Sequence, residues 1–440
     1  MLNGLLHLKD DELRRLLPFF LLYSLLFAAL SLADGLSLAL FVQEVGAKHL
    51  PAVYALVAVL NAVFVGWYFL RAFELPSDHV FKVIIGGCLS LFLVSWVSVR
   101  FFGATTFAYS LLYVSREIGS TMVLLHFGTY LQEYFTREQM NRVLPVTYAG
   151  GRVGGIVGAG MLENLSEPWG LVNMMLVVCL YFLISLVGIA IVSRRMPRAL
   201  DEDLASGAAI PPTPEETAAR TTVKGFLRYL LHSRLLYWIT ATSVLYFILR
   251  WVLNYQYNVF FEEYFDDLEF EALFFDEDEE SDSDVMNMAQ FLGRYTQIAL
   301  AVSLFLQLFV VNRMIAWFGA KVTHLVYSLL LFAALAMQPL EMTLTLAVYC
   351  RFVETELRFG LRNPVMMLIT NAFTKPVRAR VRAWTTGLLI PVATLLASGL
   401  LTVFVKYELS AALNWTGIGM AAVYLFCVFK MGSHFRGGKQ

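Results

Sequence analysis

The chain has 440 residues, of which 58% are hydrophobic and only 15% are charged. This composition excludes an ordinary soluble domain and predicts a polytopic membrane protein. The formal net charge of −1 gives no reason to expect nucleic acid as a partner.

The four cysteines, Cys88, Cys179, Cys350 and Cys427, all lie inside apolar runs, without a CxxC or His-paired spacing around them. Cysteines in this setting predict neither disulfides nor a metal site. The sequence also lacks an ATP-hydrolysis motif and a nucleophile with its base, so we expect no cofactor and no enzymatic activity.

Apolar runs of roughly twenty residues follow one another along the whole chain. There are twelve, at residues 16–42, 51–70, 80–99, 105–131, 143–162, 170–193, 236–261, 290–311, 322–340, 342–370, 383–405 and 410–429. At about 1.5 Å of rise per residue, each is long enough to cross a hydrocarbon core about 30 Å thick. The predicted fold is therefore all-α, with twelve transmembrane helices.

The basic residues between these runs predict the orientation of the chain in the membrane. Loops on the side of the two termini are rich in arginine and lysine, whereas the opposite loops carry only Lys48, Arg100 and Lys406. By the positive-inside rule, both termini are expected in the cytoplasm. Because no transit peptide is evident at the N-terminus, we expect a bacterial inner membrane.

A polar linker at residues 196–234 divides the twelve runs into six and six. It begins rich in proline, alanine and charge, and ends in VKGFLRYLLHSR, which is typical of an amphipathic helix on the inner membrane surface. The predicted domains are two six-helix bundles, residues 1–195 and 235–440. The bundles resemble each other, because YVSREIGS aligns Glu117 with Glu354 of YCRFVETE. Parallel six-helix repeats with matching intramembrane charges predict a two-lobed transporter.

The tenth apolar run carries five charged residues within twelve positions: Arg351, Glu354, Glu356, Arg358 and Arg362. Each charge in hydrocarbon costs about 2.5–3.5 kcal/mol on insertion scales, so these side chains must face protein, water or a ligand. On an α-helix all of them except Glu356 form one stripe. Its excess of arginine favours an anionic solute, since guanidinium groups suit carboxylate and phosphate. The alternative is an ion-pair ladder that only fixes the helix to its neighbours.

Other polar residues inside the apolar runs complete the predicted site. The candidate substrate-binding residues are Arg250, Asn254, Gln256, Arg294, Arg351, Arg358 and Arg362. The candidate gating or coupling residues are Asp34, Arg116, Glu117 and Glu354, because a buried carboxylate either pairs with a base or becomes protonated. For Asp34, which precedes Gly35, a local kink or cap is the alternative.

The fifth run, VTYAGGRVGGIVGAGML, has Gly150, Gly154 and Gly158 at four-residue spacing. Glycines at this spacing let two membrane helices approach closely. The run resembles a phosphate-binding glycine loop only superficially, because no Lys-Ser/Thr pair follows it. We therefore predict a helix-packing role for these glycines.

An acidic loop is predicted at residues 262–288 on the outer side. Residues 262–284 contain thirteen acidic residues and no basic one. A solvated loop is the favoured interpretation. A weak calcium site is the alternative, although the run lacks the glycine that an EF-hand loop needs.

Several segments resemble the ATP/ADP translocase family of bacterial and plastid nucleotide transporters, which are distant relatives of the major facilitator fold. They are REIGS, TREQMNRVLPVTYAGGRVGGIVGAGML, LNYQYNVFFEEYF, FLGRYTQIALAVSLFLQLFV, and VETELRFGLRNPVMMLITNAF with the following RARVRAWTTG. The resemblance implies twelve helices in a major-facilitator-like arrangement. It also implies exchange or uptake of nucleotides by way of intramembrane lysine and glutamate residues.

Carried over to this sequence, Glu117 matches a family acid in the fourth helix, and Asp34 matches the acid of a Lys-Asp pair in the first. The lysine of that pair is replaced by Ala33, and an acid at the end of the seventh helix is replaced by Asn254. A relative that handles another anion is therefore compatible with the same fold.

The function expected from the sequence is secondary transport of an anionic solute by alternating access, with a nucleotide as the first candidate solute. The alternatives are a carrier of another organic anion or lipid, and a non-transporting membrane receptor or scaffold on the same fold. Membrane lipid is the other expected partner. The sequence leaves the oligomeric state open, and a monomer is compatible with it.

Overall fold

The computed structural model describes residues 10–71, 75–103, 106–135, 137–198, 223–275, 287–370, 372–373, 377, 381 and 383–435. Helices account for almost all of these residues, and none of them lies in a strand. Within the described ranges, nine helices are long and apolar enough to cross a membrane. The predicted all-α class is confirmed.

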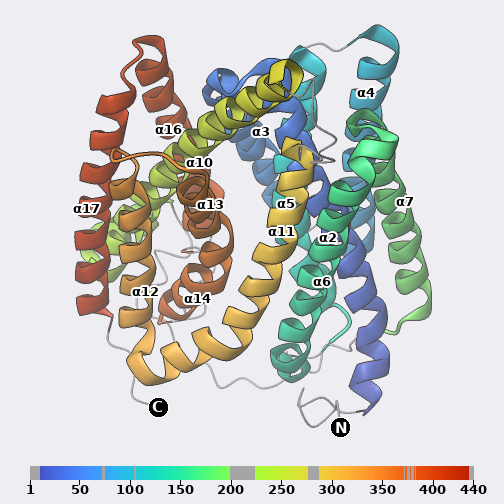
Figure 1. The fold of residues 1–440 in the computed structure, drawn as a ribbon. Coiled ribbons are helices and arrows are strands. Elements are labelled where there is room, and N and C mark those ends of the chain that lie inside the picture. Colours follow the sequence, from blue (N-terminus) through green and yellow to red (C-terminus); the bar gives the residue numbers. More distant parts are fainter. Residues whose placement is uncertain are drawn as a thin grey trace. The chain divides into compact units, whose positions relative to one another are not determined.

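Each of the twelve predicted runs coincides with a helix or with consecutive helical segments (Figure 1). The first six are α2 (Asp10–Val45), α3 (Leu50–Arg71), α4 (Ser77–Phe102), α5 (Thr106–Gln132), α6 (Arg137–Trp169) and α7 (Leu171–Arg195), with the short η1 (Ala47–His49) before α3. The amphipathic segment forms α9 (Val223–His232). The last six comprise α10 (Arg234–Phe275), α11 (Met288–Phe305) with η3 (Leu306–Val311), α12 (Asn312–Met337), α13 (Leu344–Phe352) with η4 (Val353–Arg362) and α14 (Asn363–Thr370), η5 (Ala383–Leu388) with α16 (Leu389–Lys406), and α17 (Ser410–His434).

Helix α10 is longer than the seventh apolar run, because it continues through residues predicted to belong to the acidic loop. Phe261 and Phe265, one helical turn apart, are both buried, and the Glu262 carboxylate accepts a hydrogen bond from the Ala47 backbone at 3.0 Å. These contacts stabilise the helical conformation at residues 261–265. The helix ends at Phe275. Residues 276–286, where the calcium site was considered, and linker residues 199–222 lie outside the described residues.

The chain divides into two compact units that do not follow the predicted domain boundaries. Unit 1 consists of Met1–Gly46, Val63–Ala208 and Phe265–Ala301. Unit 2 consists of Ala47–Ala62, Ala209–Tyr264 and Val302–Gln440. The first part of α3 therefore belongs to unit 2 and most of α11 to unit 1. The split into residues 1–195 and 235–440 stays a prediction.

Within unit 1, α6 lies along α2 (Figure 1). Gly154 and Gly158 of α6 lie directly against the backbone of α2, whereas Gly150 lies against the side chains of Phe20 and Ser24. A Cβ added to Gly154 would lie 1.9 Å from the carbonyl oxygen of Ser24, and one added to Gly158 would lie 2.1 Å from that of Ala28. A backbone carbonyl cannot move aside as a side chain can. Close approach of the two helices therefore depends on the absence of side chains here, as the four-residue spacing predicts.

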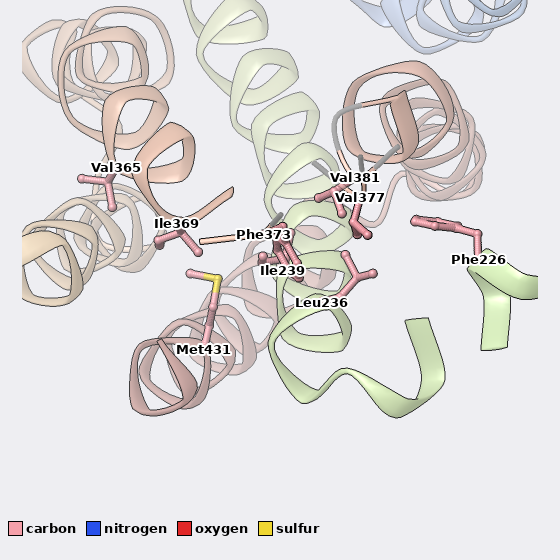
Figure 2. Packing of buried hydrophobic residues seen from close by; sticks show 9 residues of the cluster. All are labelled: Phe226, Leu236, Ile239, Val365, Ile369, Phe373, Val377, Val381 and Met431. Carbon is pink, nitrogen blue, oxygen red and sulfur yellow. The ribbon is translucent and has the colours of Figure 1, made fainter. Parts of the chain in front are cut away.

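Within unit 2, the apolar side of α9 packs on the membrane helices. Phe226 of α9 is buried, and its ring centre lies 5.7 Å from that of Trp384. Figure 2 shows the cluster around it, whose buried members come from α9, α10, α14, α17 and the segment before η5. They are Phe226, Leu236, Ile239, Val365, Ile369, Phe373, Val377, Val381 and Met431. The amphipathic helix expected at the end of the linker is thus part of the unit 2 core.

The α2–α6 contact gives a first testable prediction. We expect Gly154→Ala to lower the melting temperature strongly, because overpacking typically costs about 1–3 kcal/mol and a backbone contact relaxes poorly. Gly86→Ala in α4 is the matched control, since a Cβ there meets nothing within 4 Å. Tryptophan fluorescence of the purified proteins during heating measures both. Equal shifts for the two variants would contradict the close-packing role.

Candidate functional site

Four of the five charged residues of the tenth helix, all except Arg351 of α13, lie on η4, which is a π-helix rather than an α-helix. Backbone hydrogen bonds in a π-helix run from residue i to i+5, so each turn contains an extra residue. The α-helical spacing assumed for the single stripe does not apply across this segment, and Arg362 has a different set of neighbours from Glu354. Segments of this kind occur frequently at functional sites.

Glu354 is the centre of the charged network in unit 2. Its side chain is only 2% exposed. Its carboxylate accepts a hydrogen bond from Arg250 Nε at 2.5 Å and one from the Tyr257 hydroxyl at 3.0 Å. Nη1 of Arg358 lies 3.7 Å from the same carboxylate, at i+4 on its own helix. Two guanidinium groups therefore share one carboxylate, which leaves a net charge of +1.

Arg358 is the less engaged of these two arginines. Its distance to Glu354 is 1.2 Å longer than that of Arg250, from 3.7 − 2.5 Å. Its buried Nε makes no hydrogen bond to any described residue. A charge-assisted hydrogen bond needs about 2.7–2.9 Å, so Arg358 retains donor capacity for another anionic group.

A chain of hydrogen bonds extends the network away from Glu354. Asn254 donates to the Tyr257 hydroxyl at 2.5 Å, and the Tyr54 hydroxyl donates to Oδ1 of Asn254 at 2.6 Å. The guanidinium of Arg351 lies 5.7 Å from the centre of the Tyr257 ring. Asn254 is thus a neutral group that both donates and accepts within this chain of hydrogen bonds. Gln256 lies outside this network and donates to Asn414 at 2.6 Å.

Unit 1 contains a smaller cluster with the opposite charge balance. Arg116 lies 2.8 Å from a carboxylate oxygen of Asp34 and 2.7 Å from one of Glu117. Its guanidinium also lies 5.1 Å from the centre of the Tyr113 ring. One cation is thus shared by two carboxylates, at a net charge of −1. The base beside Asp34 is thus Arg116 of α5.

Arg294 is not part of either cluster. It belongs to unit 1, where its Nε donates to Glu163 of α6 at 2.7 Å, and its side chain is 58% exposed. Gln297 donates to the same carboxylate. Arg294 and its partner Glu163 thus both belong to unit 1, whereas the other candidate substrate-binding arginines belong to unit 2.

Glu356, which the sequence placed off the stripe, lines an apolar cavity in unit 2. The cavity has a volume of about 310 Å³ and lies among η3, α12 and η4. Its other lining residues include Leu306, Met314, Leu330 and Gly360. The cavity is separate from the Glu354 network.

Tyr54 was not predicted to belong to the site. Its surroundings in the sequence, LPAVYALVAVL, are apolar and resemble ordinary core. Its ring centre lies 4.3 Å from that of Trp251, and the guanidinium of Arg250 lies 4.7 Å from the Trp251 ring. Tyr257 was recognisable only as one member of the polar run at residues 254–258.

Comparisons with known proteins extend to the fold but not to a family. No protein-family model matches the sequence, and no functionally curated protein matches it. Solved structures do match over nearly the whole chain. A mutant of the nucleoside transporter NupG aligns with a TM-score of 0.67 at 12% identity and covers 95% of this chain and 99% of its own.

Two further transporters share this arrangement of helices. The peptide transporter POT in complex with sulfate aligns with a TM-score of 0.62 at 10% identity, covering 96% of each chain. A bacterial homologue of the human lysosomal transporter Spinster aligns with a TM-score of 0.53 at 14% identity, covering 97% of this chain and 95% of its own. The fold is major-facilitator-like. Together with the apolar helices, this likeness identifies the chain as an integral, multi-pass membrane protein.

The Glu354 network gives a second testable prediction. We expect Glu354→Gln to destabilise the protein by about 3–5 kcal/mol, because it leaves Arg250 and Arg358 buried without their counter-charge. A large fall in melting temperature would be the readout. Glu163→Gln is the control, because its partner Arg294 is mostly exposed and such pairs contribute about 0–1 kcal/mol. If both substitutions have the same small effect, Glu354 is not the centre of the network.

Proposed function

We propose that the protein is a secondary carrier of an anionic solute and that Arg358 binds the anionic group. The observation that carries this proposal is the pair of guanidinium groups on one buried carboxylate, Glu354. In such a cluster the second guanidinium group, that of Arg358, is available to an anionic group of a solute. The likeness in fold to nucleoside and peptide transporters supports a carrier over other kinds of membrane protein.

The geometry supports an exchange of ion pairs during binding. Arg250 and Tyr257 together satisfy Glu354, so Arg358 can leave that carboxylate without leaving it unpaired. A solute carboxylate or phosphate then receives the planar guanidinium, which suits two parallel hydrogen bonds. When the solute departs, Arg358 returns to Glu354. Because Glu354 keeps a partner at every step, the cost of each step stays low.

We assign gating or coupling to the Asp34–Arg116–Glu117 cluster. Here one guanidinium bridges two carboxylates, so protonation of either carboxylate would weaken its hold on Arg116. The side chain of Asp34 is 33% exposed and that of Glu117 only 11%, which favours Asp34 as the group that meets water. Transport would proceed by alternating access, driven by exchange or by an ion gradient.

A nucleotide is the first candidate solute. The resemblance to ATP/ADP translocases supports it, as does the nucleoside transporter among the proteins of like fold. Aromatic rings near the network, such as Tyr257, offer surfaces on which a base could stack. The replacements at Ala33 and Asn254 favour the second candidate, another organic anion or an anionic lipid.

A non-transporting receptor or scaffold is the alternative function, and one observation favours it. Arg351, Glu354, Glu356 and Arg362 are all buried, as expected for ion pairs that only hold helices together. In that case Arg358 would stabilise the fold without touching a solute.

We further propose that the chain resides in a bacterial inner membrane with both termini in the cytoplasm, in line with its basic loops.

Uptake of labelled ATP, ADP and inorganic phosphate into liposomes that contain the purified protein tests the proposal. We expect uptake to rise with unlabelled nucleotide inside the liposomes. Arg358→Gln should weaken it roughly 10- to 100-fold, the effect of losing a charged hydrogen bond worth about 1.5–3 kcal/mol. Arg294→Gln, the matched control outside the network, should leave uptake nearly unchanged.

The outcomes separate the candidate functions. Absence of uptake of all three solutes by folded protein rejects the nucleotide. Binding of other organic anions that depends on Arg358 would then support the second solute class. If no anion binds and Arg358→Gln only lowers the melting temperature, the carrier proposal fails in favour of the scaffold.

A further inference from the structure

Arg362 lies in an aromatic pocket of unit 2. Its side chain is buried, and its guanidinium lies 3.5 Å from the centre of the Tyr246 ring and 5.4 Å from that of Phe247. The rings of Tyr327 and Tyr424, both fully buried, have their centres 6.1 and 6.2 Å from that of Tyr246. Three helices, α10, α12 and α17, thus surround one cation from η4.

Within the described part of the chain, Arg362 makes no ion pair with a carboxylate. Arg250 and Arg358 both have Glu354 within reach, whereas no oxygen of an acidic side chain lies within 4.0 Å of a nitrogen of Arg362. A buried charge without a counter-charge is strongly unfavourable. Contact with an aromatic face offsets only part of that cost. The charge balance of the pocket is therefore incomplete.

The polar atoms around Arg362 are also short of partners. Among the described residues, the hydroxyls of Tyr246 and Tyr327, Nδ1 of His324 and Nε of Arg362 are buried and make no hydrogen bond of normal geometry. Nε2 of His324 lies 3.2 Å from the Tyr424 hydroxyl. Buried polar groups are nearly always hydrogen-bonded, and exceptions require an explanation. All of these groups are able to donate a hydrogen bond.

We propose that this pocket is a binding site for a small monovalent anion with the chemistry of chloride. The anion would neutralise Arg362 and accept hydrogen bonds from the hydroxyls of Tyr246 and Tyr327. A single guanidinium matches a single negative charge. The cavity of about 310 Å³ in unit 2 is lined by other residues and is not this site.

This site is independent of the proposed carrier function. Arg362 makes no contact with the Glu354 carboxylate, whose partners are Arg250, Tyr257 and Arg358. The anion would thus be a resident part of unit 2 and not the transported solute. Its presence should be measurable without transport.

Thermal unfolding of the full-length protein in detergent tests the proposal. The protein is prepared in gluconate, whose bulky anion replaces chloride, and chloride or bromide is then added at constant ionic strength. For the natural sequence we expect a saturable rise in melting temperature. Tyr327→Phe, which removes only the hydroxyl, should raise the half-saturating concentration at least about tenfold. Arg362→Gln should abolish the rise.

Arg313→Gln is the matched control, since Arg313 is an exposed arginine on α12, the helix that carries His324 and Tyr327. It should retain the full response to halide. A natural protein indifferent to halide, or an equal rise in Tyr327→Phe and Arg313→Gln, would overturn the site. Tyr327→Phe decides the matter if Arg362→Gln does not fold. Loss of nucleotide uptake together with an intact halide response would reject only the carrier proposal.

Discussion

The cost of burying charge in an apolar interior constrains the functional parts of this molecule. Each unit meets it by sharing counter-charges, because a lone ion inside the membrane is unfavourable. Unit 2 places two arginines on Glu354, and unit 1 places two carboxylates on Arg116. Because the central group of each cluster has two partners of opposite charge, one of them can be exchanged while the other remains.

The backbone around these clusters is as specialised as the side chains. Glycines let α6 approach α2 to backbone contact in unit 1, while a π-helix carries Glu354, Arg358 and Arg362 of unit 2. Both features depart from an ordinary helix pair. The first determines how closely two helices pack, and the second determines which way each charge points. An ideal α-helix would present the charged residues of η4 as an evenly spaced stripe. The π-helix changes that spacing.

Hydropathy alone was sufficient to locate the membrane helices, because a span needs about twenty apolar residues whatever it packs against. The pairing of Glu354 with an arginine was also predictable, since a buried acid needs a base. The arrangement of the site was not. The π-helical register of η4 changes which residues share a face. The amino-acid types in this segment do not distinguish a π-helix from an α-helix. Tyr54 comes from an apolar stretch that gives no sign of a site. The sequence shows that Arg294 is an arginine inside an apolar run, but it does not show which acidic residue lies beside it.

Asn254 shows how few genetic steps separate this site from a different one. Asparagine and aspartate have nearly the same shape, and their codons differ by a single base. Asn254→Asp would place a second carboxylate beside Tyr257, whose one hydroxyl proton now goes to Glu354. Two acids would then compete for that proton, and the net charge of the network would fall from +1 to zero. One nucleotide substitution could therefore remove the preference of this network for an anion.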